Sequence, residues 1–213
     1  MIDVDHQINA VRRTVGTTTL DAGEARVITV SQTYDTDVND LWDACTTADR
    51  ISRWAMPISG DLEVGGRYQL EGNAGGEVLS CEPPTTFSAT WEYGDEVSWI
   101  TVRLTEEGPE CARFQLEHVA HVNDALWAQF GPGAVGVGWD SLLLGLYLHV
   151  TGAPAMDPAQ AAAWAMSEEG RRFMTASSDL WYEAAVAGGD DPDAARAAAD
   201  RTTEAYTAVP EEA

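Results

Sequence analysis

The chain has 213 residues and a formal net charge of −23, and its 12 basic residues are all arginine. This length fits one domain of ordinary size with an appendage. An excess of acidic side chains repels phosphate backbones and anionic membrane surfaces, so we expect neither nucleic acid nor a membrane as a partner.

The cysteines and the N-terminus indicate a cytoplasmic protein. Cys45, Cys81 and Cys111 are odd in number and form no CxxC pair, which favours reduced thiols over a disulfide framework. The N-terminus carries acidic residues where a secretory signal would carry positive charge. No apolar run approaches membrane-spanning length.

The first 57 residues predict a short helix, two strands and two further helices. Residues 1–15 place apolar side chains at helical spacing, and residues 17–20 and 25–34 have the composition of two strands joined by a tight connection. After residue 35 the period becomes helical again. Asp37 and Thr47 are the expected N-caps, because their side-chain oxygens can accept from free first-turn amides.

From Gly60 to His121, turn-forming residues bracket five runs of strand length: RYQLE, EVLSCE, TFSATWEY, EVSWITVRL and ECARFQLEHVAH. With the first long strand they predict a curved antiparallel sheet of about six or seven strands. Alternation does not place Trp99. It predicts an inward face made of Phe87, Ala89, Trp91, Tyr93, Ser98, Ile100, Val102, Leu104, Phe114, Leu116 and His118.

A long core helix is expected at residues 138–151, after a short helix that starts at Asn123. Its apolar positions recur at three and four residues, and a long helix after a run of strands indicates an α+β fold. The preceding GPGAVG matches the GxGxxG nucleotide fingerprint only formally, because a helix and not a strand precedes it. We interpret these glycines as a tight lead-in to the helix.

The C-terminal part predicts helices over residues 158–187 and 193–207. Isolated amphipathic helices of this length are marginal in water. We therefore expect them to pack on the rest of the chain or on a second copy of it, which would make a homodimer.

No pattern in the sequence predicts a catalytic residue, a metal or a cofactor. His118 and His121 lack further ligands at a recognised zinc spacing, and no serine, cysteine or aspartate stands in a nucleophile motif such as GxSxG. His118 within an apolar concavity is either a hydrogen-bonded structural residue or a group that orients a ligand.

Several segments between residues 25 and 152 together resemble a known family. They are YDTDVNDLWD at 34–43, DRISRW at 49–54, GDLEVGGRYQLEG at 60–72, Glu82-Pro83-Pro84 followed by Thr90-Trp91, residues 98–104 and 116–118, and Gly138-Trp139 before Leu142-Leu143. This pattern resembles the helix-grip fold of the START-like, or SRPBCC, superfamily, and within it the branch named for the activator of the 90-kilodalton heat-shock chaperone's ATPase. The tail, with SEEGRRFM, SSDLWYEAA and AADRTTEAYT, is similar to that of a bacterial subgroup.

The resemblance implies a cavity between sheet and long helix, usually for hydrophobic ligands, although the fold hosts many activities. It divides the chain into an N-terminal extension at 1–24, a helix-grip domain at 25–152 and a helical extension at 153–213. We expect a binding protein for a small hydrophobic or aromatic ligand; the alternatives are a module that regulates a chaperone ATPase or another protein partner, and a cyclase- or hydrolase-like enzyme that uses His118. The alternative interpretation of the aromatic residues is ordinary core packing. The ligand-binding candidates are Trp54, Tyr68, Trp91, Tyr93, His118, Trp139, Leu143 and Tyr147.

Overall fold

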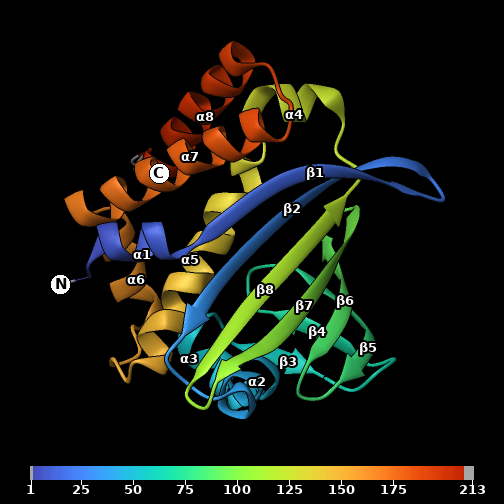
Figure 1. The fold of residues 1–213 in the computed structure, drawn as a ribbon, viewed down its shortest axis with the longest axis vertical. Coiled ribbons are helices and arrows are strands. Elements are labelled where there is room, and N and C mark those ends of the chain that lie inside the picture. Colours follow the sequence, from blue (N-terminus) through green and yellow to red (C-terminus); the bar gives the residue numbers. More distant parts are fainter. Residues whose placement is uncertain (1, 209–213) are drawn as a thin grey trace.

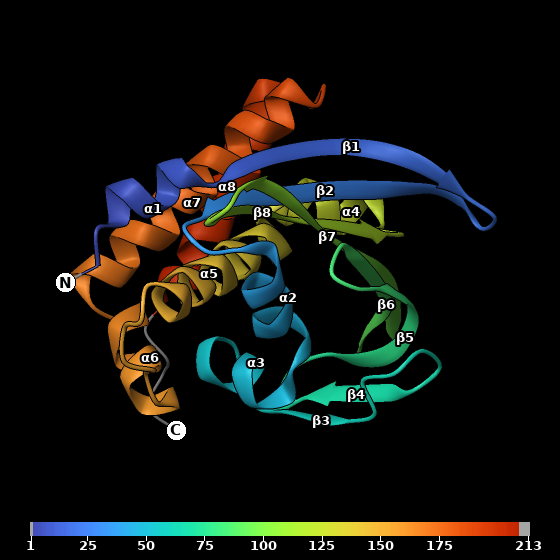
Figure 2. The ribbon, with the colours of Figure 1, turned by 60° about the horizontal axis from the view of Figure 1, so that its bottom comes forward.

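An eight-stranded antiparallel sheet forms the centre of the protein in the computed structural model, which describes residues 2–208. The strand order is β1-β2-β8-β7-β6-β5-β4-β3. The sheet curves into a C, and helices lie across its open side (Figures 1 and 2). The strands are β1 (Arg12–Leu20), β2 (Gly23–Tyr34), β3 (Ile58–Gly60), β4 (Arg67–Leu70), β5 (Gly75–Glu82), β6 (Thr86–Tyr93), β7 (Glu96–Gly108) and β8 (Cys111–Ala120).

This architecture confirms the predicted α+β class and corrects the strand count from six or seven to eight. The strand β3 is only three residues long, which is too short for an alternating pattern to reveal it. The N-terminal helix, α1 (Val4–Ala10), is also shorter than predicted. Residues from Arg12 onward belong to β1, where pairing with β2 along its whole length overrides their weak helical spacing.

The two predicted short helices are α2 (Val38–Thr46) and α3 (Ala48–Trp54). Asp37 caps α2 as expected, because its carboxylate accepts from the amides of Asn39 and Asp40. Thr47 stands at the N-cap of α3 but makes no side-chain capping bond. Its hydroxyl instead donates to a carboxylate oxygen of Asp43, 2.6 Å away.

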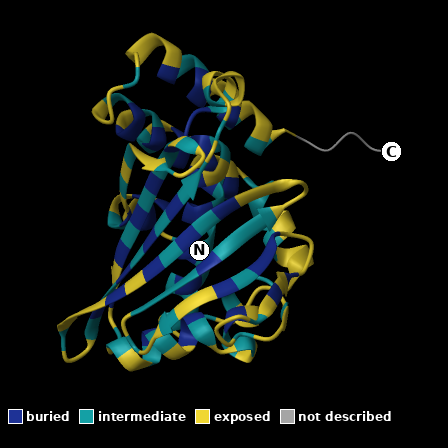
Figure 3. Ribbon diagram, turned by 90° about the vertical axis from the view of Figure 1, so that its right-hand side faces the viewer, coloured by how far each residue is buried: buried dark blue, intermediate teal, exposed yellow. Residues whose placement is uncertain are grey.

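The inward face of the sheet agrees with the alternation of the sequence (Figure 3). Of the eleven residues expected there, Tyr93 at the end of β6 is the exception, with 65% of its surface exposed. Trp99 projects from β7 and packs edge-on against His121, with ring centroids 6.1 Å apart. The remaining ten are buried or half-buried.

The core helix α5 (Gly133–Val150) begins five residues earlier than expected, after α4 (Asp124–Phe130). The lead-in interpretation of its glycines is therefore wrong, because all but the first lie within the helix. A Cβ at Gly136 would collide with the ring of Trp181, and a Cβ at Gly145 would collide with the backbone oxygen of Trp54. Glycine at these positions allows neighbouring elements to approach the helix closely.

Three tail helices pack on the body of the same chain: α6 (Pro158–Ala165), α7 (Glu168–Ala187) and α8 (Pro192–Thr207). The helix α7 lies against α5, β1 and α1, and α8 lies against α7 and α4 (Figure 1). The predicted homodimer stays a prediction. Among the described residues α5 alone is long and apolar enough to cross a membrane, yet it is a partly buried core helix.

A buried polar cluster joins the tail to the body. Asp140 of α5 accepts through Oδ2 from Nε of Arg13 at 2.9 Å, from Nε1 of Trp181 at 3.2 Å and from the hydroxyl of Ser177. The side chains of Arg13 and Asp140 are 3% and 0% exposed. Burial raises the pKa of Asp140, while Arg13 and the other donors oppose that shift. The cluster therefore links β1, α5 and α7 through one carboxylate.

Candidate ligand-binding site

Two adjoining chambers lie between the sheet and α5. The outer chamber has a volume of about 780 Å³ and the inner one about 160 Å³. Together they are in the range typical of small-molecule sites. Six side chains line both chambers and so form their common boundary: Trp54, Ala55, Met56, Trp91, Trp139 and Leu142.

The inner chamber is apolar and has no charged residue among those that line it. The hydroxyl of Tyr68 donates to the backbone oxygen of Thr90 at 2.6 Å, and burial raises the pKa of Tyr68 to about 12. Burial likewise raises the pKa of the Cys45 thiol to about 12. Both groups are therefore neutral at physiological pH, and the chamber suits the apolar part of a ligand.

The outer chamber opens to solvent between exposed apolar side chains: Tyr93, Val97, Leu126, Val135 and Met156. These come from β6, β7, α4, α5 and the segment before α6. The tail completes the wall with Ala161 and Trp164 of α6, Met174 of α7 and Tyr206 of α8. The chamber thus depends on the C-terminal helices as well as on the sheet and α5.

A chain of hydrogen bonds fixes His118 on the inward face of β8. The indole N–H of Trp139 donates to Nδ1 at 3.1 Å. Because an indole nitrogen can only donate, Nδ1 must be the acceptor, and the ring proton lies on Nε2. Nε2 then donates to the hydroxyl of Ser98 at 2.8 Å, and that hydroxyl donates to the backbone oxygen of Trp91 at 2.9 Å.

This network makes His118 a structural residue of the cavity wall. Burial lowers the pKa of His118 to about 4, so the ring is neutral at physiological pH. Its two nitrogens are both occupied by protein partners, which leaves neither a lone pair nor an N–H for a substrate. The geometry does not favour the enzyme alternative, which uses His118 as an acid or base.

Aromatic rings surround the same point. The centroids of Trp91 and Trp139 are 4.8 Å apart, and the ring of His118 stands edge-on to Trp139 at 5.6 Å. Trp54 is held nearby by a hydrogen bond from its indole N–H to the backbone oxygen of Ala44 at 2.9 Å. The boundary between the chambers is therefore built largely from aromatic rings, and the indole hydrogen bonds of Trp54 and Trp139 leave the apolar faces of those two rings for contact.

Seven of the eight residues predicted for the ligand line one chamber or both. Trp54, Trp91 and Trp139 line both. Tyr68 and Leu143 line the inner chamber, and Tyr93 and His118 line the outer one.

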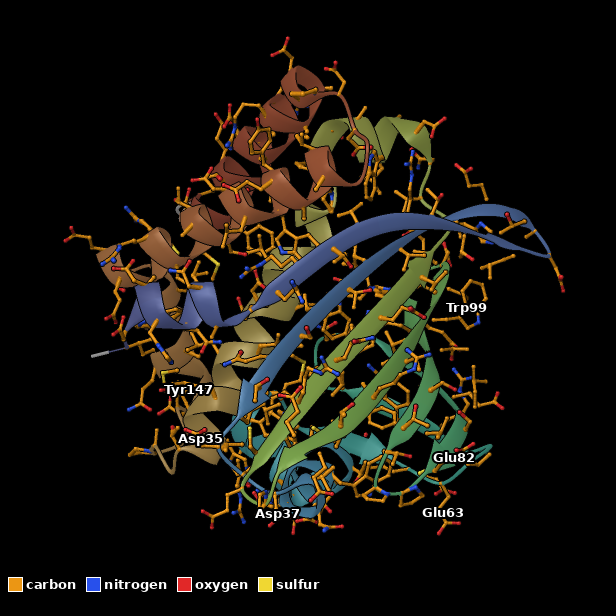
Figure 4. The ribbon with its side chains drawn as sticks, in the orientation of Figure 1. Asp35, Asp37, Glu63, Glu82, Trp99 and Tyr147 are labelled. Atoms are coloured by element: carbon orange, nitrogen blue, oxygen red, sulfur yellow. The ribbon has the colours of Figure 1, made fainter. Side chains whose placement is uncertain are left out.

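Tyr147 is the exception, because it lines neither chamber. It lies near α1, to the left of the sheet in Figure 4, where its ring centroid is 5.9 Å from that of His6. Each four-residue step along an α-helix turns the side chain by about 40°, so two steps beyond Trp139 point it out of the cavity.

The sequence patterns missed the tail residues and Arg26 as parts of the wall. Nothing in an alanine-rich tail indicates which of its residues reach a distant cavity. The sequence could have indicated Arg26, however, because this residue continues the alternation of Ile28 and Val30 on β2. Among residues 2–208, no group of three or more histidine, cysteine, aspartate or glutamate side chains could hold a metal ion.

Comparison with known proteins places this geometry in a family. The family model described as "Activator of Hsp90 ATPase homolog 1-like protein" matches residues 35–150, more than half of the chain. The crystal structure of CalU16 from Micromonospora echinospora is 34% identical, with a TM-score of 0.66 over 82% of this chain and 98% of that one. Its solution structure, also 34% identical, gives 0.70 over 84% and 97%. MLL2253 from Mesorhizobium loti is 26% identical, with a TM-score of 0.50 over 58% and 96%. Curated proteins gave no significant match.

Proposed function

This chain belongs to the family of activator of Hsp90 ATPase homolog 1-like proteins, in the START-like superfamily, and we propose that it binds a small hydrophobic or aromatic ligand. The observation that carries this proposal is the outer chamber of about 780 Å³ adjoining an uncharged inner chamber. Space of this size between well-packed elements is unusual, because protein interiors are normally close-packed.

The lining supports an apolar ligand. The three tryptophans of the boundary present large apolar surfaces, and their contact with a ring or chain would remove that surface from water. Satisfied hydrogen bonds hold Trp54 and Trp139 in place before any ligand arrives. Such preorganisation reduces the entropic cost of binding.

Nile red is a suitable probe, because a neutral dye is not repelled by a chain of net charge −23. We expect its fluorescence to rise on binding and the tryptophan fluorescence to be quenched. Ala89→Leu, which adds bulk to the inner chamber, should weaken binding by about tenfold. Ala187→Leu makes the same change on the exposed end of α7 and should leave binding unchanged.

Equal affinity of the wild type and both variants would place the dye outside the inner chamber. No binding of Nile red or of any member of a lipid panel at micromolar protein, together with native mass spectra free of ligand, would contradict the proposal itself.

The family's description raises a second function, regulation of a chaperone ATPase. An ATPase assay with the source organism's own chaperone separates the two functions. Stimulation that survives Ala89→Leu would favour the chaperone, whereas no effect at micromolar protein would count against it.

A further inference from the structure

Arg26 is the one basic side chain, histidines aside, among the residues that line the outer chamber. It projects from β2 opposite Ala120 of β8. Its side chain is 24% exposed. The other charged residue that lines this chamber is Glu96, at the start of β7.

The guanidinium of Arg26 is held in place, yet among the described residues it donates no hydrogen bond. It stacks over the ring of Trp127 in α4, 4.7 Å from the centroid. Its nearest carboxylate, Asp124, is 3.7 Å away, which is too long for a hydrogen bond, and that side chain is 97% exposed. An ion pair with such an exposed partner contributes little to stability, so Asp124 does not commit the guanidinium and leaves it able to pair with another anion.

Polarity falls along β2 from Arg26 inward. Arg26 and Ile28 line the outer chamber, and Val30 lines the inner one. Alternate residues of a strand share a face, so these three follow one another along the wall over about 13 Å. The cavity is therefore charged at one end and uncharged at the other.

Resting on the proposed function, we propose that the ligand is an amphipathic carboxylate whose head group pairs with Arg26 and whose apolar body extends toward Val30. The planar guanidinium can donate two parallel hydrogen bonds to a carboxylate. The inner chamber would not accept that charge, because burying an unpaired carboxylate is costly. These two constraints fix the orientation of the ligand.

Dodecanoate and the neutral alcohol of the same chain length, dodecanol, test the charge preference, with each displacing Nile red at neutral pH. We expect wild-type protein to bind dodecanoate at least about tenfold more tightly than dodecanol, the size of a charge-assisted hydrogen bond. Arg26→Gln should abolish this preference, and dodecanol should still displace Nile red from the variant, which shows that the cavity is intact. Arg103→Gln, at an exposed position of β7, is the matched control and should retain the preference.

Equal affinities of wild-type protein for the two ligands would overturn this inference, and so would a preference for dodecanoate that survives Arg26→Gln. Binding of Nile red without displacement by dodecanoate would overturn it too, while leaving the proposed function in place. Failure to bind the dye and both ligands would overturn the proposed function and this inference with it.

Discussion

The two sides of α5 are built on opposite physical principles. Trp139 faces the sheet, where two chambers adjoin its ring. Asp140, the next residue and about 100° further round the helix, faces α7 and β1, where it is buried among Arg13, Ser177 and Trp181. Trp139 therefore borders open space, whereas the surroundings of Asp140 are filled, although other tail residues help to wall the outer chamber.

The difference shows how a fold of this kind can keep a cavity. Open volume forfeits packing energy, so the elements that frame it need support from elsewhere. On the tail side that support is a buried ion pair and the close contact of Gly136 with Trp181. These contacts fix α5 and so hold Trp139 in place beside the open chambers. Four predictions test this contrast, beginning with the largest effect.

Removing the carboxylate on the tail side should have the greatest cost. Asp140→Ala leaves the buried charge of Arg13 uncompensated and removes an acceptor from Ser177 and Trp181. We expect the free energy of unfolding, measured by urea denaturation, to fall by about 3–5 kcal/mol.

The control is Asp179→Ala, which breaks an exposed pair with Arg196 and should cost less than about 1 kcal/mol. Equal losses of unfolding free energy for the two variants would contradict a special role of the buried cluster around Asp140.

Acid should lower the stability of the folded protein through protonation of His118, on the cavity side of α5. Its pKa is about 4 in the folded protein and about 6.5 unfolded, so the unfolded chain takes up a proton first as the pH falls. The stability that the neutral ring contributes is complete above pH ~6.5 and is lost toward pH ~4, by about 3 kcal/mol in total.

The measurement is the free energy of unfolding against pH for wild type and His118→Phe. The carboxylates titrate equally in both proteins, so the difference between the two curves reports on His118 alone. The wild type should lose about 3 kcal/mol more over this range. Parallel curves would show that His118 does not titrate as a buried neutral ring.

A single methyl group should be costly on the tail side. In Gly136→Ala the new Cβ collides with the ring of Trp181, and overpacking of this kind costs about 1–3 kcal/mol. Gly16→Ala is the matched control, since a Cβ there meets nothing within 4 Å. Thermal unfolding should show a clear fall in Tm for the first variant alone, and an unchanged Tm for Gly136→Ala would mean that α7 can move away.

A larger addition should be tolerated on the cavity side. Ala89→Leu adds three carbons to the wall of the inner chamber, where about 160 Å³ is available. We expect the free energy of unfolding to change by less than about 1 kcal/mol, the smallest effect of the four. A loss as great as that of Gly136→Ala would mean that the chamber is filled in solution.

The cavity side was more predictable from sequence than the tail side. Alternation between turn signals identified the inward faces of β6 to β8, because a half-buried strand repeats every two residues. The tail side depends on contacts between distant residues: Arg13 and Asp140 are 127 positions apart. An aspartate within an apolar helix gives no local sign of such a partner.

Glycine explains why the start of α5 was predicted wrongly. Gly133 and Gly136 suggested a lead-in because glycine is a poor helix former. The structure continues the helix through them because Thr202 and Trp181 pack against those positions. Tertiary contact there outweighs local propensity.

The most direct test of the account is a crystal structure of the protein grown with Nile red. We predict density for the dye in contact with Trp91 and Trp139, with its apolar end toward the inner chamber and the hydrogen bonds of His118 unchanged. Dye found only on the surface, with those side chains closed over a filled interior, would contradict a ligand site on the open side of α5.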